Sequence, residues 1–315
     1  MRRLVFSLFF LSASAFSQNL QTDAAAFAAS LWNYHVYPNI VYHTANNYEA
    51  QLDVYTPPGH GQPTPVAIII HGGGWIEGKK EERVVEVMPY LQMGFAAVNV
   101  EYRLARVSPA PAAVIDCRCA LHWVVANAKK YNFDVSRMVV MGGSAGGHLA
   151  LTTGMLTPAA GFDRECYAPD DPVWKQAGGT AHDPRVAAIV NWFGITDVLD
   201  EIHGPNTKGY AVIWIGDRPD ADEIAKRVSP INMIRKDTPP IITIHGDHDE
   251  LVPYEDSVKF HRALTAAGVV NQLYTVPGGN HGGFSAEETQ KIWATIRQFL
   301  NQNVKGTAPG TVNSK

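Results

Sequence analysis

The stretch Gly142-Gly143-Ser144-Ala145-Gly146-Gly147 decides the fold of this chain. The apolar run before it, residues 138–141, predicts a buried strand, and the pattern after it, residues 148–151, predicts a helix. A serine between a strand and a helix, with glycines two residues away on both sides, is typical of a nucleophile elbow. Such a turn is tight and strained, so only small residues fit at Gly142 and Gly146. We therefore expect the Ser144 hydroxyl to stand at the carboxyl edge of a sheet, where a substrate can reach it.

The rest of the chain alternates between strand patterns and helix patterns. Several strand patterns are nearly continuous β-branched runs, as expected for strands covered on both faces. The expected strands cover residues 40–42, 51–55, 66–70, 96–102, 138–141, 186–192, 241–244 and 272–276, and the expected helices cover residues 81–92, 111–130, 145–156, 254–267 and 285–303. This alternation predicts a doubly wound, mostly parallel, eight-stranded α/β sheet with helices on both faces. The first two strands have no helix between them and are expected to form an antiparallel edge.

The composition is that of a globular protein. Of the 315 residues, 46% are hydrophobic and 18% are charged, which allows a sizeable core. The formal net charge of −4 argues against nucleic acid or an anionic membrane surface as a partner. No segment after the N-terminus is apolar enough to cross a membrane.

Residues 1–17 have the pattern of a secretory signal peptide. They begin with Met1-Arg2-Arg3, continue with an apolar run over residues 4–11 and end in small residues, so cleavage is expected after Ala15 or Ser17. The alternative, an N-terminal anchor helix, is disfavoured because the apolar run is too short to span a bilayer comfortably. The sequence therefore predicts a secreted or periplasmic protein.

After the signal peptide we expect a short variable segment over residues 18–39, one catalytic domain over residues 40–303 and a disordered tail over residues 304–315. Two insertions in the domain, residues 157–185 and 198–230, do not follow the alternation. Each of them either shapes a substrate pocket or forms a surface excursion.

The chain has three cysteines, Cys117, Cys119 and Cys166. Export permits disulfide bonds. Cys117 and Cys119 stand two residues apart in an expected helix and point to different sides, which disfavours a bond between them. A bond from either of them to Cys166 stays open.

Donors for a negatively charged oxygen are expected in His71-Gly72-Gly73-Gly74-Trp75, which follows the expected strand 66–70. Glycines allow the backbone to turn so that neighbouring N–H groups face one point in space. The N–H groups of Gly73 and Gly74, together with that of Ala145 behind the serine, would then form an oxyanion hole.

An acid and a base follow later in the chain. The acid lies in His245-Gly246-Asp247-His248-Asp249-Glu250, just after the strand 241–244, and Asp249 is favoured because Asp247 is well placed to bond to its own turn. A metal site is the less favoured reading of this cluster. His245 is expected to pack at the strand end, whereas His248 and Glu250 are expected to face solvent. The base is His281, the last histidine, which lies in a glycine-flanked loop before the final helix.

The order Ser144, Asp249, His281 and the motifs around these residues resemble the α/β-hydrolase superfamily. The resemblance is to hormone-sensitive-lipase-like esterases and to bacterial feruloyl-esterase-like or acetyl-xylan-esterase-like enzymes. It covers about residues 40–302 and includes Asn191-Trp192-Phe193-Gly194-Ile195-Thr196-Asp197.

Two departures from this pattern stand out. The segment 18–39 leaves little room for the N-terminal helical cap of the lipase-like branch, which weakens any inference about long-chain substrates. Glu101 stands where an Asp is often seen before the Tyr-Arg pair, and we expect it to act structurally behind the glycine loop.

The resemblance implies an exported serine carboxylesterase that needs no cofactor and no metal. Its expected substrates are short-acyl esters, including acetyl or feruloyl esters of plant polysaccharide. The same machinery also cleaves amides, so an amidase, formamidase or peptidase is an alternative. A non-catalytic binding protein with the same fold is disfavoured by the complete set of reactive residues.

Overall fold

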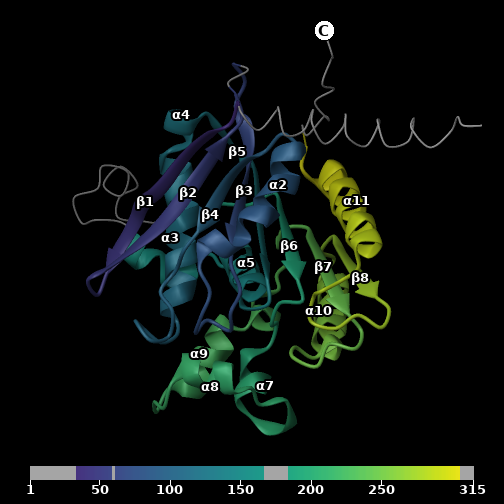
Figure 1. Ribbon diagram of the computed structural model, residues 1–315. Coiled ribbons are helices and arrows are strands. Elements are labelled where there is room, and N and C mark those ends of the chain that lie inside the picture. Colours follow the sequence, from purple (N-terminus) through teal and green to yellow (C-terminus); the bar gives the residue numbers. More distant parts are fainter. Residues whose placement is uncertain (1–32, 59–60, 167–183, 306–315) are drawn as a thin grey trace, which may run out of the picture.

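The structure is a computed structural model that describes residues 33–58, 61–166 and 184–305. Its centre is one eight-stranded sheet with the strand order β1-β2-β4-β3-β5-β6-β7-β8 (Figure 1). The strands are β1 His35–Ala45, β2 Tyr48–Thr56, β3 Thr64–Ile70, β4 Ala96–Val100, β5 Phe133–Gly143, β6 Ala188–Trp192, β7 Ile241–Gly246 and β8 Asn271–Val276. β2 pairs in antiparallel fashion with both β1 and β4, and all other neighbouring strands run parallel. The expected mostly parallel sheet with an antiparallel edge is confirmed.

Helices cover both faces of the sheet, which explains the continuous apolar runs in the strands. In β3, Val66, Ile68 and Ile70 face one core, and Ala67 and Ile69 face the other. The first core is covered by α3 (Ala112–Ala126), α5 (Ala145–Met155) and α10 (Tyr254–Ala266). The second is covered by α2 (Val84–Gln92) and α11 (Ala286–Asn303).

The expected elements differ from the observed ones mainly at their ends. β1 begins at His35, inside the segment 18–39 that was expected to precede the domain. The expected helix 81–92 starts with the 3₁₀ turn η1 (Lys80–Arg83), and the expected helix 111–130 is broken before α4 (Ala128–Tyr131). Such end effects follow from tertiary contacts that hydrophobic periodicity does not report.

The second insertion, residues 198–230, folds into three short helices that the sequence pattern does not reveal. These are α7 (Val198–Ile202), α8 (Gly209–Ile215) and α9 (Ala221–Val228), with the turn η4 (Gly204–Asn206) between the first two and η5 (Pro230–Met233) after the third. They form a small cluster at one end of the molecule (Figure 1). Helices of five to eight residues are too short to display a clear helical period.

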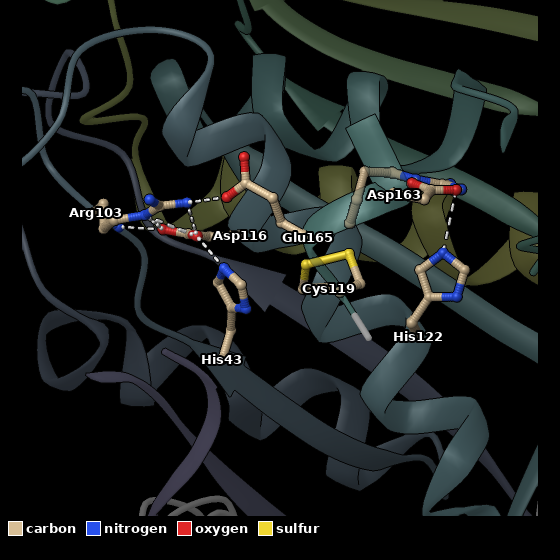
Figure 2. Close-up of a disulfide and its surroundings, with 9 residues drawn as sticks. His43, Arg103, Asp116, Cys119, His122, Asp163 and Glu165 are labelled. Carbon is tan, nitrogen blue, oxygen red and sulfur yellow. Dashed lines mark hydrogen bonds and ion pairs between the residues drawn. A yellow bond between two sulfur atoms is a disulfide. The ribbon is translucent and has the colours of Figure 1, made fainter. Parts of the chain in front are cut away.

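The first insertion begins with two 3₁₀ turns, η2 (Pro158–Ala160) and η3 (Phe162–Cys166), and η3 is fastened to α3. A disulfide bond joins Cys119 of α3 to Cys166, while Cys117 is a buried free thiol. Figure 2 shows the disulfide bond together with Asp163. The buried Arg118 donates two hydrogen bonds to Asp163, of 2.7 and 2.6 Å. The structure therefore selects Cys119 from the two partners that the sequence leaves open.

Several expectations fall on residues outside the described ranges. These are the signal peptide 1–17, residues 18–32 of the variable segment, residues 167–183 of the first insertion and residues 306–315 of the tail. Within the described ranges, none of the helices has both the length and the apolar character needed to cross a membrane.

Candidate active site

The serine turn joins β5 directly to α5. Ser144 has φ 58° and ψ −126°, a positive-φ conformation that costs free energy in a non-glycine residue. Its N–H donates to the Trp192 carbonyl at 2.9 Å, which ties the turn to the end of β6. A Cβ on Gly142 would overlap the Gly146 carbonyl, and a Cβ on Gly146 would overlap the Ile70 carbonyl. The expected requirement for glycine at both positions is confirmed.

Asp249 and His281 are brought together although 32 residues separate them in the chain. His281 Nδ1 lies 2.7 Å from Asp249 Oδ2. The other carboxylate oxygen, Oδ1, accepts the backbone N–H groups of Leu251 and Val252 at 2.8 and 2.9 Å. Asp247 instead accepts the N–H of Gly278, which lies 31 residues away in the loop after β8, at 2.6 Å, so the expectation that Asp247 bonds to its own turn is wrong.

The Asp249 carboxylate is fully buried and is held by two imidazoles rather than one. Besides His281, His245 Nε2 lies 3.1 Å from Asp249 Oδ2, and His245 Nδ1 is 2.7 Å from the Ser257 hydroxyl. Burial alone would raise the pKa of Asp249, but the hydrogen bonds from His245, His281 and the Val252 amide overcome burial and hold the pKa well below its ordinary value. Asp249 therefore stays ionised.

The contact between His245 and Asp249 was missed by the sequence analysis, which gave His245 a packing role. A histidine four residues before the favoured aspartate was the available signal, but only the turn after β7 brings the two side chains together. His248 and Glu250 are exposed, as expected.

Phe193 is a second residue that the sequence did not single out. Its backbone has φ 38°, which is rare for an aromatic residue, and its ring centroid lies 4.5 Å from that of His281. The ring also lies 3.4 Å from the position that a Cβ on Gly282 would take. Phe193 thus packs against the loop that carries the imidazole.

The glycine loop after β3 has an unusual backbone. Gly73, Gly74 and Trp75 have φ values of 110°, 56° and 60°, and the Gly73 carbonyl accepts the N–H groups of residues 76 and 77. Within the described residues, the N–H groups of Gly73 and Gly74 donate to no backbone carbonyl. Ala145 is buried as the first residue of α5, where an N–H has no partner within its own helix.

The glycine loop is held from behind by buried aromatic side chains. Trp75 donates its indole N–H to His148 Nδ1 at 3.2 Å, and His148 Nε2 lies 2.8 Å from the Val228 carbonyl. Burial lowers the pKa of His148 to about 4, so this imidazole is neutral near pH 7. Trp214 of α8 stacks on Trp75 with ring centroids 4.1 Å apart. The second insertion therefore packs behind the glycine loop and supports it. It is not merely a surface excursion.

Glu101 lies behind the same loop, as expected. Its carboxylate accepts the Lys80 N–H at 2.8 Å and lies 3.5 Å from His71 Nε2. It is not among the residues that line the cavity described next.

Ser144, His281, Gly73 and Gly74 line one cavity of about 750 Å³. Aromatic side chains form much of its wall, and three charged residues reach it. The aromatic residues are Trp192, Phe193, Tyr210, Phe284 and Trp293, and the charged residues are Glu77, Arg83 and Glu86.

One group among the described residues has the side chains of a metal site. His122, Asp163 and Cys166 place ligand atoms within 4.8 Å of one another. The Cys166 sulfur is used in the disulfide, however, and the Asp163 oxygens accept from Arg118 (Figure 2). This group therefore does not fit a metal ion.

Comparisons with known proteins agree with this geometry. Residues 52–264, more than half of the chain, match the BD-FAE family model, a match that includes Ser144 and Asp249 and ends before His281. Esterase LipC of Mycobacterium tuberculosis is 27% identical over 76% of this chain, and the chain spans only 59% of the length of LipC.

Two solved structures have the same fold. A truncated carbohydrate esterase from gut microbiota is 28% identical with a TM-score of 0.67, and the match covers 85% of this chain and 97% of that chain. The thermophilic esterase Est2 of Thermogutta terrifontis, solved with propionate bound, is 25% identical with a TM-score of 0.68, and the match covers 86% of this chain and 94% of that chain. Family match, fold and site agree, and the chain belongs to the BD-FAE family with the α/β-hydrolase fold.

Proposed function

We propose that this protein is a serine carboxylesterase whose reactive groups are Ser144, His281 and Asp249. One observation carries the proposal: Ser144 and His281 line one cavity, and a buried, ionised carboxylate lies 2.7 Å from the far nitrogen of that histidine. LipC and the two solved relatives are named as esterases, which supports this assignment.

In the proposed mechanism, Asp249 accepts the Nδ1–H of His281 and leaves Nε2 to take the proton of Ser144. The serine oxygen bonds to the ester carbonyl carbon, and the carbonyl oxygen becomes negative. The N–H groups of Gly73, Gly74 and Ala145 stabilise that oxygen. The carbon–oxygen bond to the alcohol then breaks, His281 returns its proton to the leaving alcohol, and water hydrolyses the acyl-enzyme by the same steps in reverse.

We propose short acyl groups as the substrates, with acetyl or feruloyl esters of plant polysaccharide as the natural ones. The name of the gut carbohydrate esterase and the propionate bound in Est2 support a short acyl group and a sugar alcohol. Export through the signal peptide 1–17 to the periplasm or the medium is part of this proposal, because such substrates are too large to enter a cell.

The proposal is tested with a fluorophosphonate probe, which labels only an activated serine. Wild type is expected to be labelled, Ser144→Ala is expected to stay unlabelled, and Ser136→Ala, an exposed serine on β5, serves as the matched control. A panel of aryl esters and aryl amides with growing acyl length then separates an esterase from an amidase. An unlabelled wild-type protein would favour a non-catalytic hydrolase fold.

A further inference from the structure

The cavity that Ser144 lines borders a second groove, which is lined by residues of α2 and α11. Pro89 of α2 and Thr289 and Trp293 of α11 line both the cavity and the groove, which has a volume of about 680 Å³. The two helices cover the same face of the sheet (Figure 1), and residues of both line the groove. A chain attached to a group at Ser144 therefore has a path away from the serine.

The groove has one residue pattern along α11. Gln290, Trp293, Arg297 and Asn301 line it at spacings of three and four residues, so they form one stripe on the helix. The helix rises by about 16 Å over the eleven residue steps from Gln290 to Asn301. The stripe is long enough for several sugar rings in a row.

The side chains of the groove fit an uncharged polyol. Five of the lining residues are carboxamides, and Arg297 is the one charged residue among the lining residues that are described. The five are Gln92, Gln290, Gln298, Asn301 and Gln302. A carboxamide both donates and accepts hydrogen bonds, as sugar hydroxyls do. An acyl chain offers no hydrogen-bonding groups to the Gln92, Gln290, Gln298 and Gln302 amides, and a polyanion would meet Arg297 as the one cation among the described lining residues.

Trp293 stands where the cavity meets the groove and is held in place by other rings. Its ring centroid lies 5.4 Å from that of Trp192 and 5.7 Å from that of Tyr90. A fixed, partly exposed aromatic face can pack against the C–H face of a pyranose without losing further freedom.

Arg83 and Glu86 line the cavity on the α2 side. Arg83 Nη1 donates to Glu86 Oε1 at 2.8 Å. Both side chains are about one-third exposed. A substrate hydroxyl can therefore accept from the exposed part of the Arg83 guanidinium, and the next hydroxyl can donate to the Glu86 carboxylate.

We propose that the α2–α11 groove binds an uncharged glycan chain, with the esterified sugar at Arg83 and Glu86 and the following sugars along Trp293, Gln290 and Gln298. This inference rests on the proposed esterase function, because it places the scissile ester at Ser144. It assigns the sugar chain a site of its own, separate from the reacting groups.

The test measures kcat/KM on acetylated xylo-oligosaccharides of one to six sugars and, in the same preparations, on an aryl acetate. For wild type, kcat/KM is expected to rise with chain length by about tenfold or more, mainly through a lower KM. In a Gln290→Ala/Gln298→Ala double variant, both exposed positions, the ratio of long-chain to aryl-acetate efficiency is expected to fall by about tenfold. Gln272→Ala, an exposed carboxamide on β8 outside the groove, is the matched control and should keep the wild-type ratio.

Each failure has its own signature. A wild type that hydrolyses the aryl acetate but shows no gain with chain length would overturn the groove and leave the esterase intact, whereas no aryl-acetate hydrolysis would refute the esterase itself. A double variant that gains as much from chain length as wild type would also overturn the proposal that the groove binds the glycan. So would a preference for acidic over neutral oligosaccharides, or a change in the double variant's mass by light scattering, which would mark a contact between copies.

Discussion

Glu201 of α7 is a buried acid whose replacement should change how stability depends on pH. Its side chain is fully buried, Oε1 accepts from the Tyr210 hydroxyl at 3.2 Å, and Oε2 has no hydrogen-bond partner among the described residues. Burial, aided by the nearby carboxylates Asp256 and Asp200, raises the pKa of Glu201 to about 8 against the opposing hydrogen bond from Tyr210. Tyr210 also lies against Gly74, so it connects this acid to the proposed oxyanion loop.

The sign and the size follow from proton linkage. An unfolded glutamate titrates near 4.5, so between about pH 4.5 and 8 the folded state holds a proton that the unfolded state has released. The stability due to this group is fully present below pH 4.5 and is lost as the pH rises through about 8. The slope is at most about 1.4 kcal/mol per pH unit, so the loss between pH 5.5 and 7.5 is at most about 3 kcal/mol. Glu201→Gln keeps the acceptor for Tyr210 and removes the proton, and with it this slope.

The assay is urea unfolding followed by tryptophan fluorescence at pH 5.5, 6.5 and 7.5 and constant ionic strength. Other titrating groups contribute to both proteins alike, so the difference between variant and wild type isolates Glu201. That difference should move in favour of Glu201→Gln as the pH rises. Glu223→Gln, an exposed carboxyl on α9, should run parallel to wild type. Parallel curves for wild type and Glu201→Gln would refute a proton held at this site.

Three further predictions concern the site and its frame. Asp249→Asn should lower kcat by up to about 10⁴-fold, which is the loss seen in a serine protease, and by less for esters with good leaving groups. Asp247→Asn should have a modest effect, and circular dichroism should show that both variants are folded. The reverse ranking would move the acid to Asp247. Gly146→Ala should cost about 3 kcal/mol in urea unfolding, because its Cβ meets backbone carbonyls, and an unchanged midpoint would contradict that clash. Replacing Cys119 and Cys166 by serine should lower the free energy of unfolding by about 4 kcal/mol, because the disulfide closes a loop of 47 residues. Equal stability of this variant and the oxidised wild type would contradict a closed disulfide.

The order of the strands and of the longer helices, and the positions of the candidate reactive residues, follow from the sequence alone. β-branched runs such as residues 66–70 encode strands covered on both faces, and the glycines around Ser144 encode a turn that tolerates no side chain. Both of these features are decided within about ten residues of chain. The local argument for Asp249 over Asp247 does not hold, because Asp247 accepts the N–H of Gly278, 31 residues away, and Asp249 is the residue that accepts N–H groups of its own turn.

Only the tertiary structure decided which distant side chains meet. Trp214 stacks on Trp75 although 139 positions separate them, and Cys119 bonds to Cys166 although 47 positions separate them. His245 reaches Asp249 only because the chain turns sharply after β7. The groove between α2 and α11 exists only because both helices cover one face of the sheet. Hydrophobic periodicity and turn residues predict the local structure of each segment. Contacts between distant segments depend on how the elements pack, which a single sequence does not show.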